Sequence, residues 1–307
     1  MIQVTSYPGP HDVTRPAYRR DVEAPVLVTG ATGTVGQRAV ELLSARGVGV
    51  RAAARRPGAG SGFVEPVAFD FRDPATFAAA FAGVRTALLV RPPALGRVRD
   101  LVPALQAGVD AGLRHVVFLS VQGAGRVPVL PHAGIERWLR ASPLSWTFLR
   151  PSFFDQNLVG VHGAAIRRTG ELSVPAGRGR TAFVDAHDVA AVAALALADP
   201  GAHAGRAYTL TGSEALTYDE VAAIITAVGG RTVRYTRPGL LRYAASAHRD
   251  QGLPAALVVA TSVIYTTARL GLAAGLTEDT ARLLGRAPTT MAAFVVREQR
   301  QLVPGTS

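Results

Sequence analysis

The 307-residue sequence predicts an α/β fold, in which a Rossmann-type, doubly wound parallel sheet is followed by a smaller, mostly helical C-terminal lobe. Three observations lead to this prediction. An apolar segment at 26–29 runs into a glycine-rich turn and then into an amphipathic helical pattern. Strand patterns alternate with helical patterns as far as residue 151. Beyond residue 213, helical patterns dominate.

The first half of the chain alternates between the two patterns in a regular order. Strands are predicted at 26–29, 48–54, 66–69, 86–90, 115–119 and 145–149, and helices at 34–46, 74–82, 96–111 and 132–141. Strands joined through helices pair in parallel by right-handed crossovers. This order therefore predicts a parallel sheet with helices on both faces.

The second half is expected to complete the sheet and then to build the lobe. Strands are predicted at 181–184 and 206–210, and helices at 187–198, 218–228, 238–249, 253–270, 277–284 and 289–301. The domain boundaries follow: a flexible arm at 1–24, a dinucleotide-binding core at 25–155 completed by the strands near 181–184 and 206–210, and a lobe at 156–180 and 213–307. The lobe is expected to cover the carboxyl ends of the strands, where open α/β sheets bind ligands.

The composition narrows the classes of function. Cysteine is absent, which excludes disulfides and thiolate catalysis and fits the cytoplasmic location that we expect. All 33 basic residues are arginine and the net charge is +11, but the arginines are dispersed, so we expect no nucleic-acid partner. The longest uncharged apolar stretch, 253–268, is short for a membrane span, so no membrane is expected. A monomer or homodimer that takes a small-molecule substrate is the expected state.

The glycine-rich turn indicates the class of ligand. Glycines at this spacing allow a tight turn, a close approach to a pyrophosphate and close packing of the helix on the strand. The free N–H groups and the positive end of the helix then face the anion. A turn without a ligand is the alternative. The residues expected to bind the cofactor here are Gly30, Thr32, Gly33, Thr34, Val35 and Gly36.

The end of the second strand favours NADP(H) over NAD(H). Arg55 and Arg56 stand where an acidic residue would bind the ribose hydroxyls of NAD, and guanidinium groups suit a 2′-phosphate. The alternative is that both arginines only solvate a loop. Asp70 and Phe71, after the third strand, are expected beside the adenine, or else they are surface turn residues. The remaining cofactor candidates follow later strands: Val90, Arg91, Pro92, Ser120, Pro151 and Phe153.

Several segments together resemble a known family. They are Thr-Gly-Ala-Thr-Gly-Thr-Val-Gly at 29–36, Arg-Arg-Pro at 55–57, Leu-Arg-Pro-Ser-Phe-Phe at 149–154 with Asn157, Phe-Val-Asp-Ala-His-Asp-Val-Ala at 183–190, and a tail at 275–288. This set is similar to the atypical short-chain dehydrogenase/reductases, and most of all to their NmrA-like branch. The resemblance covers roughly residues 25–302. That branch includes NAD(P)H-dependent quinone and triphenylmethane reductases as well as non-catalytic redox sensors.

The chain departs from the wider superfamily at its usual catalytic residues. A Ser after the fifth strand, a Tyr about a dozen residues later and a Lys four residues after the Tyr form the usual set, in which the lysine lowers the pKa of the tyrosine. Ser120 matches the first position, but His132 and Glu136 occupy the other two. The chain contains no lysine, so the Tyr-Lys mechanism is excluded at this site.

The candidates for catalysis are Ser120, which could orient a substrate oxygen, and His132, which could donate a proton if its pKa is near the ordinary ~6.5. The alternative is that His132 and Glu136 only support the first turns of a helix. Expected substrate-pocket residues are Phe154, Asn157, Tyr243 and Tyr265, although Asn157 could equally be a packing residue. Asp185, His187 and Asp188 match a helix start, where an acid caps free N–H groups, so no metal is expected.

The function predicted from these residues is an NADPH-dependent reductase. It would transfer hydride to a hydrophobic aromatic, quinone, enone or ketone small molecule without the Tyr-Lys pair. Two alternatives stay open: a non-catalytic NADP-binding redox sensor, and a cofactor-assisted isomerase or epimerase.

Overall fold

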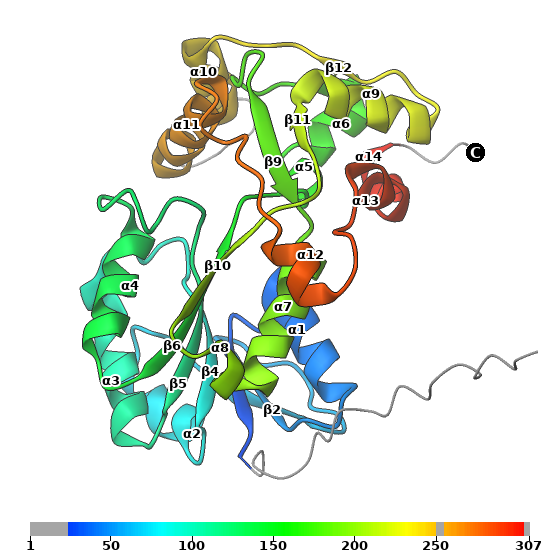
Figure 1. Cartoon of the computed structure of the whole chain (residues 1–307). Coiled ribbons are helices and arrows are strands. Elements are labelled where there is room, and N and C mark those ends of the chain that lie inside the picture. Colours follow the sequence, from blue (N-terminus) through cyan, green and yellow to red (C-terminus); the bar gives the residue numbers. More distant parts are fainter. Residues whose placement is uncertain (1–23, 250–254, 304–307) are drawn as a thin grey trace, which may run out of the picture.

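A computed structural model describes residues 24–249 and 255–303 of the chain, and Figure 1 shows their arrangement. An α/β core forms the lower part and a lobe of helices and short strands forms the upper part. All but one residue of the arm predicted at 1–24 lie outside the described residues.

The core contains a seven-stranded parallel sheet, so the predicted fold class is confirmed. The strands run in the order β10-β6-β5-β4-β1-β2-β3. Their bounds are β1 (Val26–Thr29), β2 (Val50–Ala54), β3 (Val64–Ala68), β4 (Thr86–Val90), β5 (His115–Leu119), β6 (Ser145–Pro151) and β10 (Arg206–Leu210). Because the order reverses between β1 and β4, the carboxyl ends of these two strands form the switch point at which doubly wound sheets bind ligands.

Helices cover both faces of this sheet. Helices α1 (Thr34–Ser44) and α7 (Ala186–Ala198) share one apolar core with β1, β2 and β4. Helices α2 (Phe77–Phe81), α3 (Val102–Asp110) and α4 (Pro131–Ala141) share another on the opposite face. The helices predicted at 74–82 and 96–111 are shorter than expected, because 3₁₀ turns occupy Pro74–Thr76 and Val98–Asp100. A short helix, α8 (Pro200–His203), precedes β10.

The predicted strand at 181–184 forms, but not in the core sheet, which corrects the expected domain boundaries. It is part of β9 (Arg180–Val184), which pairs with β7 (Phe153–Phe154) and β11 (Ala215–Thr217) in a separate three-stranded sheet. Strand β10 occupies the sheet edge instead, with Tyr208 in register with Leu149 of β6. The ring of Phe183 packs in the apolar core of the lobe, so this strand is buried against the lobe rather than within the core sheet.

The lobe is built from short elements around one apolar core. They are α5 (Asn157–Gly160), α6 (Gly163–Thr169), β8 (Glu171–Leu172), α9 (Tyr218–Gly229), β12 (Arg234–Tyr235), α10 (Leu240–Arg249), α11 (Ala255–Arg269), α13 (Met291–Arg297) and α14 (Gln299–Leu302). Helix α12 (Asp279–Leu284) was expected here, but its leucines pack on the core beside α7, so this boundary is also corrected (Figure 1).

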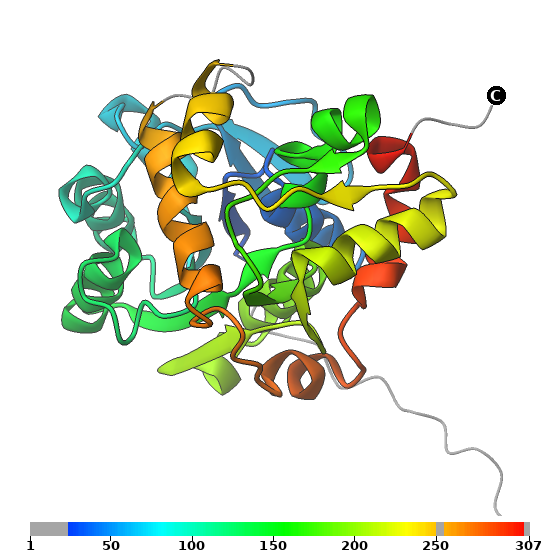
Figure 2. The ribbon, with the colours of Figure 1, turned by 90° about the horizontal axis from the view of Figure 1, so that it is seen from above.

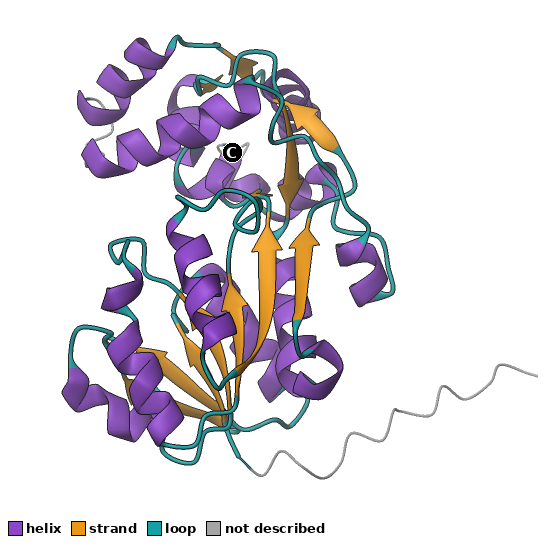
Figure 3. Ribbon diagram, turned by 60° about the vertical axis from the view of Figure 1, so that its left-hand side comes forward, coloured by secondary structure: helices purple, strands orange, loops and turns teal. Residues whose placement is uncertain are grey.

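The lobe lies beyond the carboxyl ends of the core strands. In Figure 3 the arrowheads of the central strands point toward it, and in Figure 2 the lobe helices lie over the sheet when the molecule is seen from above. In the described ranges, no helix combines the length and the apolar character that crossing a membrane requires.

Candidate cofactor and active site

The glycine-rich turn between β1 and α1 has a steric reason for each of its glycines. Gly30 adopts a φ of +64°, and a Cβ there would lie 3.1 Å from the Cβ of Val90 on β4. At Gly33 a Cβ would lie 3.3 Å from the carbonyl oxygen of Gly30. At Gly36 a Cβ would overlap that same carbonyl group, because α1 packs directly on the turn. Larger residues would therefore push the helix away from the strand.

This turn presents free donors toward solvent. Thr32, Gly33 and Thr34 are exposed, and no side chain caps the first N–H groups of α1. Val35 is buried in the core, so it can contribute only its backbone. No acidic residue lies in the first turn of α1 to compete with an anion. The tight glycine turn and the start of α1, which no side chain caps, thus fit a pyrophosphate held by backbone N–H groups at the helix N-terminus.

Thr29 is a structural residue of this site that the sequence analysis did not single out. Its hydroxyl donates to the carbonyl of Leu88 at 3.0 Å and accepts from the N–H of Val90 at 2.8 Å. It therefore joins β1 to β4 at the switch point. In the sequence, the signal for this role was a threonine at the end of an apolar strand, directly before a glycine.

The two arginines after β2 lie on the surface of the core. Arg55 and Arg56 are exposed, and within the described part of the chain neither side chain has a hydrogen bond or an ion pair. Both guanidinium groups are therefore free for an anionic ligand. Asp70 accepts a hydrogen bond from the N–H of Arg72 at 2.9 Å. The ring of Phe71 packs against Phe69 inside the core, which corrects the alternative that Phe71 is a surface turn residue.

The predicted catalytic serine is part of a buried ionic network. Ser120 follows β5, and its hydroxyl donates to Glu136 of α4 at 2.7 Å. Arg150 of β6 binds the same carboxylate in a bidentate manner, with Nε at 2.9 Å and Nη2 at 2.6 Å. Arg140 adds a further contact at 3.1 Å, and the Glu136 side chain is fully buried.

This network fixes the charge of Glu136 and the role of Ser120. Burial by itself raises the pKa of Glu136, but hydrogen bonds from Arg150 and Ser120 and the charges of Arg150 and Arg140 bring that pKa below its usual range. The carboxylate is ionised and accepts the only hydroxyl proton of Ser120. Ser120 is also almost completely buried. It therefore has no proton to offer to a substrate oxygen in this arrangement.

The structure corrects the expectation that His132 titrates near neutral pH. Burial, together with the positive charge of Arg91, lowers the pKa of His132 to about 4, although Glu136 acts in the opposite direction. The Nε of Arg91 lies 3.4 Å from Nε2 of His132, and a guanidinium can only donate. The imidazole is therefore neutral at physiological pH.

Arg91 itself lies at the cofactor edge, in the loop after β4. Its Nη1 donates to the backbone carbonyls of Pro92 and Leu95 at 3.1 and 2.6 Å. Val90, Arg91 and Pro92 are all half-buried beside the glycine-rich turn. The predicted cofactor residues of β4 and of the turn are thus brought together.

The predicted substrate residues separate into two groups. Phe153 and Phe154 are half-buried after β6, whose last residue, Pro151, is buried. Asn157 begins α5 and is also half-buried.

The two tyrosines are buried, which corrects their expected role as substrate-pocket residues. Tyr243 and Tyr265 are each 2% exposed inside the core of the lobe. The hydroxyl of Tyr265 lies 2.6 Å from Nε2 of His162, and that of Tyr243 donates to Thr261 at 3.0 Å. The sequence around the two tyrosines gave no signal of this burial, because His162, the hydrogen-bond partner of Tyr265, is distant in the chain.

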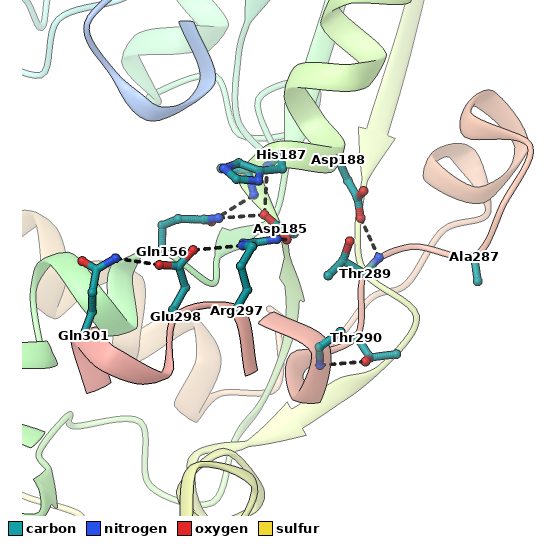
Figure 4. Close-up of polar contacts among 12 residues, drawn as sticks. Gln156, Asp185, His187, Asp188, Ala287, Thr289, Thr290, Arg297, Glu298 and Gln301 are labelled. Carbon is teal, nitrogen blue, oxygen red and sulfur yellow. Dashed lines mark hydrogen bonds and ion pairs between the residues drawn. The ribbon is translucent and has the colours of Figure 1, made fainter. Parts of the chain in front are cut away.

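The acidic residues at the start of α7 connect the lobe to the core (Figure 4). Asp185 caps α7 through the N–H of His187, as predicted, and it also accepts from Gln156 and from Arg297 of α13, both at 2.7 Å. Burial raises the pKa of Asp185, but the hydrogen bonds from Arg297, His187 and Gln156 lower it below its usual range.

The neighbouring carboxylates complete this junction. Asp188 accepts from Arg286 at 2.5 Å. It also accepts from the N–H of Thr289 at 2.6 Å (Figure 4). Asp155 is buried beside both, and burial and the charge of Asp185 raise its pKa well above the usual value. In the described ranges, no group of three such side chains is arranged to hold a metal ion. The junction is therefore a tether between lobe and core.

Comparisons with known proteins agree with this geometry. The model of the NmrA-like family matches residues 23–242. The chain is 36% identical over 280 residues to an NAD(P)H azoreductase of Xenophilus azovorans, covering 88% of this chain and 96% of that protein. The structure resembles the NADPH complex of the quinone oxidoreductase QOR2 of Escherichia coli with a TM-score of 0.78 at 26% identity, covering 89% of this chain and 99% of that one. It also resembles the triphenylmethane reductase of Citrobacter sp. with a TM-score of 0.79 at 25% identity, covering 90% and 99%.

Proposed function

The chain belongs to the NmrA-like family and is an NAD(P)H-dependent oxidoreductase, and from this premise we propose that it uses NADPH to reduce conjugated aromatic or quinonoid small molecules, such as quinones and azo or cationic aryl compounds. One observation carries the choice of substrate class. Neither candidate catalytic residue can act as an acid at neutral pH, because Ser120 donates to Glu136 and His132 is neutral with a pKa of about 4.

A site without an acid favours acceptors that stabilise the added electrons themselves. The bound nicotinamide would supply a hydride, that is, a proton with two electrons. A quinone delocalises the added negative charge, and water can then protonate the product. An extended cation is neutralised by the hydride and needs no proton. A simple ketone develops a localised alkoxide, which needs a proton donor that neither Ser120 nor His132 provides here. The azo, quinone and dye reductases that resemble the chain support the same class.

The choice of NADPH over NADH rests on Arg55 and Arg56. Both guanidinium groups are exposed and unpaired in the described part of the chain, at the end of β2, where the adenosine ribose binds in this fold. The backbone cradle at Gly30, Gly33 and Gly36 would hold the pyrophosphate. The cytoplasmic location and the monomeric or homodimeric state stay predictions of the sequence.

The test is turnover with both cofactors. The protein is mixed with NADPH or NADH and with a panel of quinones, azo dyes, cationic dyes, enones and ketones, and the loss of cofactor absorbance is followed. We expect faster reduction with NADPH, and reduction of the conjugated acceptors rather than of simple ketones. Tight NADPH binding without turnover of any acceptor would contradict the proposal and favour the redox-sensor alternative.

A further inference from the structure

A cavity in the lobe is lined mostly by polar side chains. Its volume is about 410 Å³, which falls within the range of about 300–1,000 Å³ that small-molecule sites occupy. Its walls come from α10 and from the segments that continue β8 and β12. The lining residues are Glu171, Ser173, Thr236, Pro238, Arg242, Ala245, Ser246 and Arg249.

This cavity is separate from the candidate cofactor site. All of its lining residues belong to the lobe, and none is among the residues expected to bind the cofactor or the hydride acceptor. In Figures 1 and 3, α10 lies farther from the core sheet than α11 does. The proposed reduction therefore assigns no ligand to this cavity.

Helix α10 supplies one wall through a single stripe of residues. Side chains at the spacing i, i+3, i+4 and i+7 lie on one face of a helix. Another face of α10 is fixed to the lobe, because Tyr243 is buried and its hydroxyl donates to Thr261 of α11 at 3.0 Å. The stripe that lines the cavity consists of Arg242, Ala245, Ser246 and Arg249.

The two-stranded sheet of β8 and β12 positions the opposite wall. Leu172 and Tyr235 are in register, and the N–H of Thr236 donates to the carbonyl of Leu172 at 3.1 Å. The hydroxyl of Tyr235 donates to the carbonyl of Val174 at 2.9 Å and holds the segment after β8. Ser173 and Thr236, which follow the paired residues, therefore leave the sheet side by side.

The backbone at the rim of the cavity is strained. Among the described residues, Arg237 is the one residue other than glycine with a positive φ, +46°. It lies between the lining residues Thr236 and Pro238, and its side chain pairs with Asp219 at 2.5 Å. Non-glycine residues in this conformation are uncommon and gather at functional sites, so the rim is a second indication of a ligand site.

The polar side chains that line the cavity are available to a ligand. Within the described part of the chain, Arg242 and Arg249 form neither a hydrogen bond nor an ion pair through their side chains. The three hydroxyl groups of the lining and the carboxylate of Glu171 are equally without a partner there. Two guanidinium groups and one carboxylate leave the lining with one net positive charge. The cavity therefore favours an anion.

We propose that this cavity binds a small hydroxylated organic anion. Arg242 and Arg249 bind its phosphate or carboxylate group, because guanidinium groups form paired, charge-assisted hydrogen bonds with such oxyanions. The hydroxyls of the lining and the carboxylate of Glu171 bind the hydroxyl groups of the ligand. An inorganic anion alone would fill only a small part of the cavity, so the occupant is an organic molecule. This site is additional to the proposed function and does not depend on it.

The test is calorimetric titration of the full chain with three probes. Glucose 6-phosphate and gluconate carry the two anionic groups on a hydroxylated body, and glucose is the neutral counterpart. The protein is first saturated with NADPH, so that the probes do not enter the cofactor site. We expect saturable binding of at least one anion, at one site per chain, and much weaker binding of glucose. The anion that binds more tightly identifies the preferred group as phosphate or carboxylate.

Arg242→Gln and Arg249→Gln test the two residues directly. Each variant should weaken the tighter anion about tenfold, since a hydrogen bond to a charged group is lost. Both positions are exposed, so the thermal unfolding and the NADPH affinity should stay as in the wild type.

Arg168→Gln is the matched control, because it removes the same charge from an exposed position of the lobe, on α6, outside the cavity. It should leave the affinity for both anions unchanged. The chain has a net charge of +11, and equal weakening by Arg168→Gln and Arg242→Gln would show only general attraction of anions to a basic protein. That result, the absence of saturable binding of both anions, or glucose binding as tightly as glucose 6-phosphate would overturn the inference.

Discussion

The glycine-rich turn of the core and helix α11 of the lobe are held in place by different kinds of contact. At the cofactor edge, one short segment from Thr29 to Gly36 supplies the strand end, the turn and the helix start. The position of α11 depends instead on contacts from distant segments, among them His162 and Phe153 with Tyr265. The comparison teaches that the glycine-rich turn is encoded locally, whereas the position of α11 arises from the packing of the lobe.

Gly36→Ala gives the largest expected effect and tests the local side of this comparison. Alanine normally stabilises a helix relative to glycine by about 1 kcal/mol. Here its Cβ would overlap the carbonyl of Gly30 and push the glycine-rich turn away from α1. We expect NADPH affinity to fall about a hundredfold, as two charge-assisted hydrogen bonds to the pyrophosphate are lost. Fluorescence titration with NADPH measures the change.

The control for this variant is Gly58→Ala. Gly58 is exposed, and a Cβ there would meet no atom within 4 Å, so NADPH affinity should be unchanged. A Gly36→Ala protein that bound NADPH like the wild type would show that the close approach of α1 to the turn is not required.

Arg297→Met tests the distant contacts that hold the lobe. Asp185 is fully buried, and without its partner the carboxylate would be left uncompensated. We expect the free energy of unfolding at neutral pH to fall by about 3 kcal/mol. Because the folded-state pKa of Asp185 is depressed, the stability from this pair is present above the unfolded pKa, and the deficit should shrink as acid protonates the carboxyl. Urea unfolding at several pH values measures this.

Arg38→Met is the matched control, because Arg38 pairs with Glu41 on the exposed surface of α1. In this variant the free energy of unfolding should fall by less than about 1 kcal/mol. An equal loss in the free energy of unfolding for the two variants would contradict the view that the contact between α13 and Asp185 stabilises the fold.

The double variant Arg55→Ala with Arg56→Ala sharpens the assignment of the cofactor. We expect NADPH affinity to fall about tenfold or more, since a hydrogen bond to a charged group contributes about 1.5–3 kcal/mol. NADH affinity should be nearly unchanged, because it lacks the 2′-phosphate. Arg72→Ala, at another exposed position of the same sheet edge, is the control. Equal weakening of both cofactors would refute the preference for NADPH.

The smallest expected effect concerns His132. Since its pKa is lowered to about 4, its charge does not change near neutrality, and kcat/KM for quinones should be flat between about pH 6 and pH 8. His132→Gln should keep the rate within about threefold, because no proton transfer is lost. A pH-rate profile with a limb near the ordinary pKa of histidine, absent in the variant, would restore His132 as the acid.

The elements read most accurately from the sequence are those with strong local patterns. The strands predicted at 26–29, 86–90, 115–119 and 206–210 have these same bounds in the structure. The strand at 181–184 also forms, but β10 occupies the edge of the core sheet, and this strand pairs with β7 and β11 instead. Periodicity shows that a segment is a strand, but it does not identify the partner.

The candidate site shows the same limit at the level of side chains. The glycines and the two arginines could be read from the sequence, because their roles depend on the adjacent strand ends. The pKa of His132 could not, since it depends on burial and on Arg91, which lies in the loop after β4 and is distant in the chain. Nor could the tether between Asp185 and Arg297, whose members are far apart in the chain.

The fully buried carboxylate of Glu136 restricts how this protein can evolve or be engineered. Installing the missing pair by His132→Tyr and Glu136→Lys would place an ammonium group between the guanidinium groups of Arg140 and Arg150. Three cations would then meet where the Glu136 side chain is now fully buried, and the lysine would deprotonate or the helix would move. Conversion into an ordinary carbonyl reductase therefore requires at least four coordinated substitutions, and the intermediates with only some of them are expected to fold poorly.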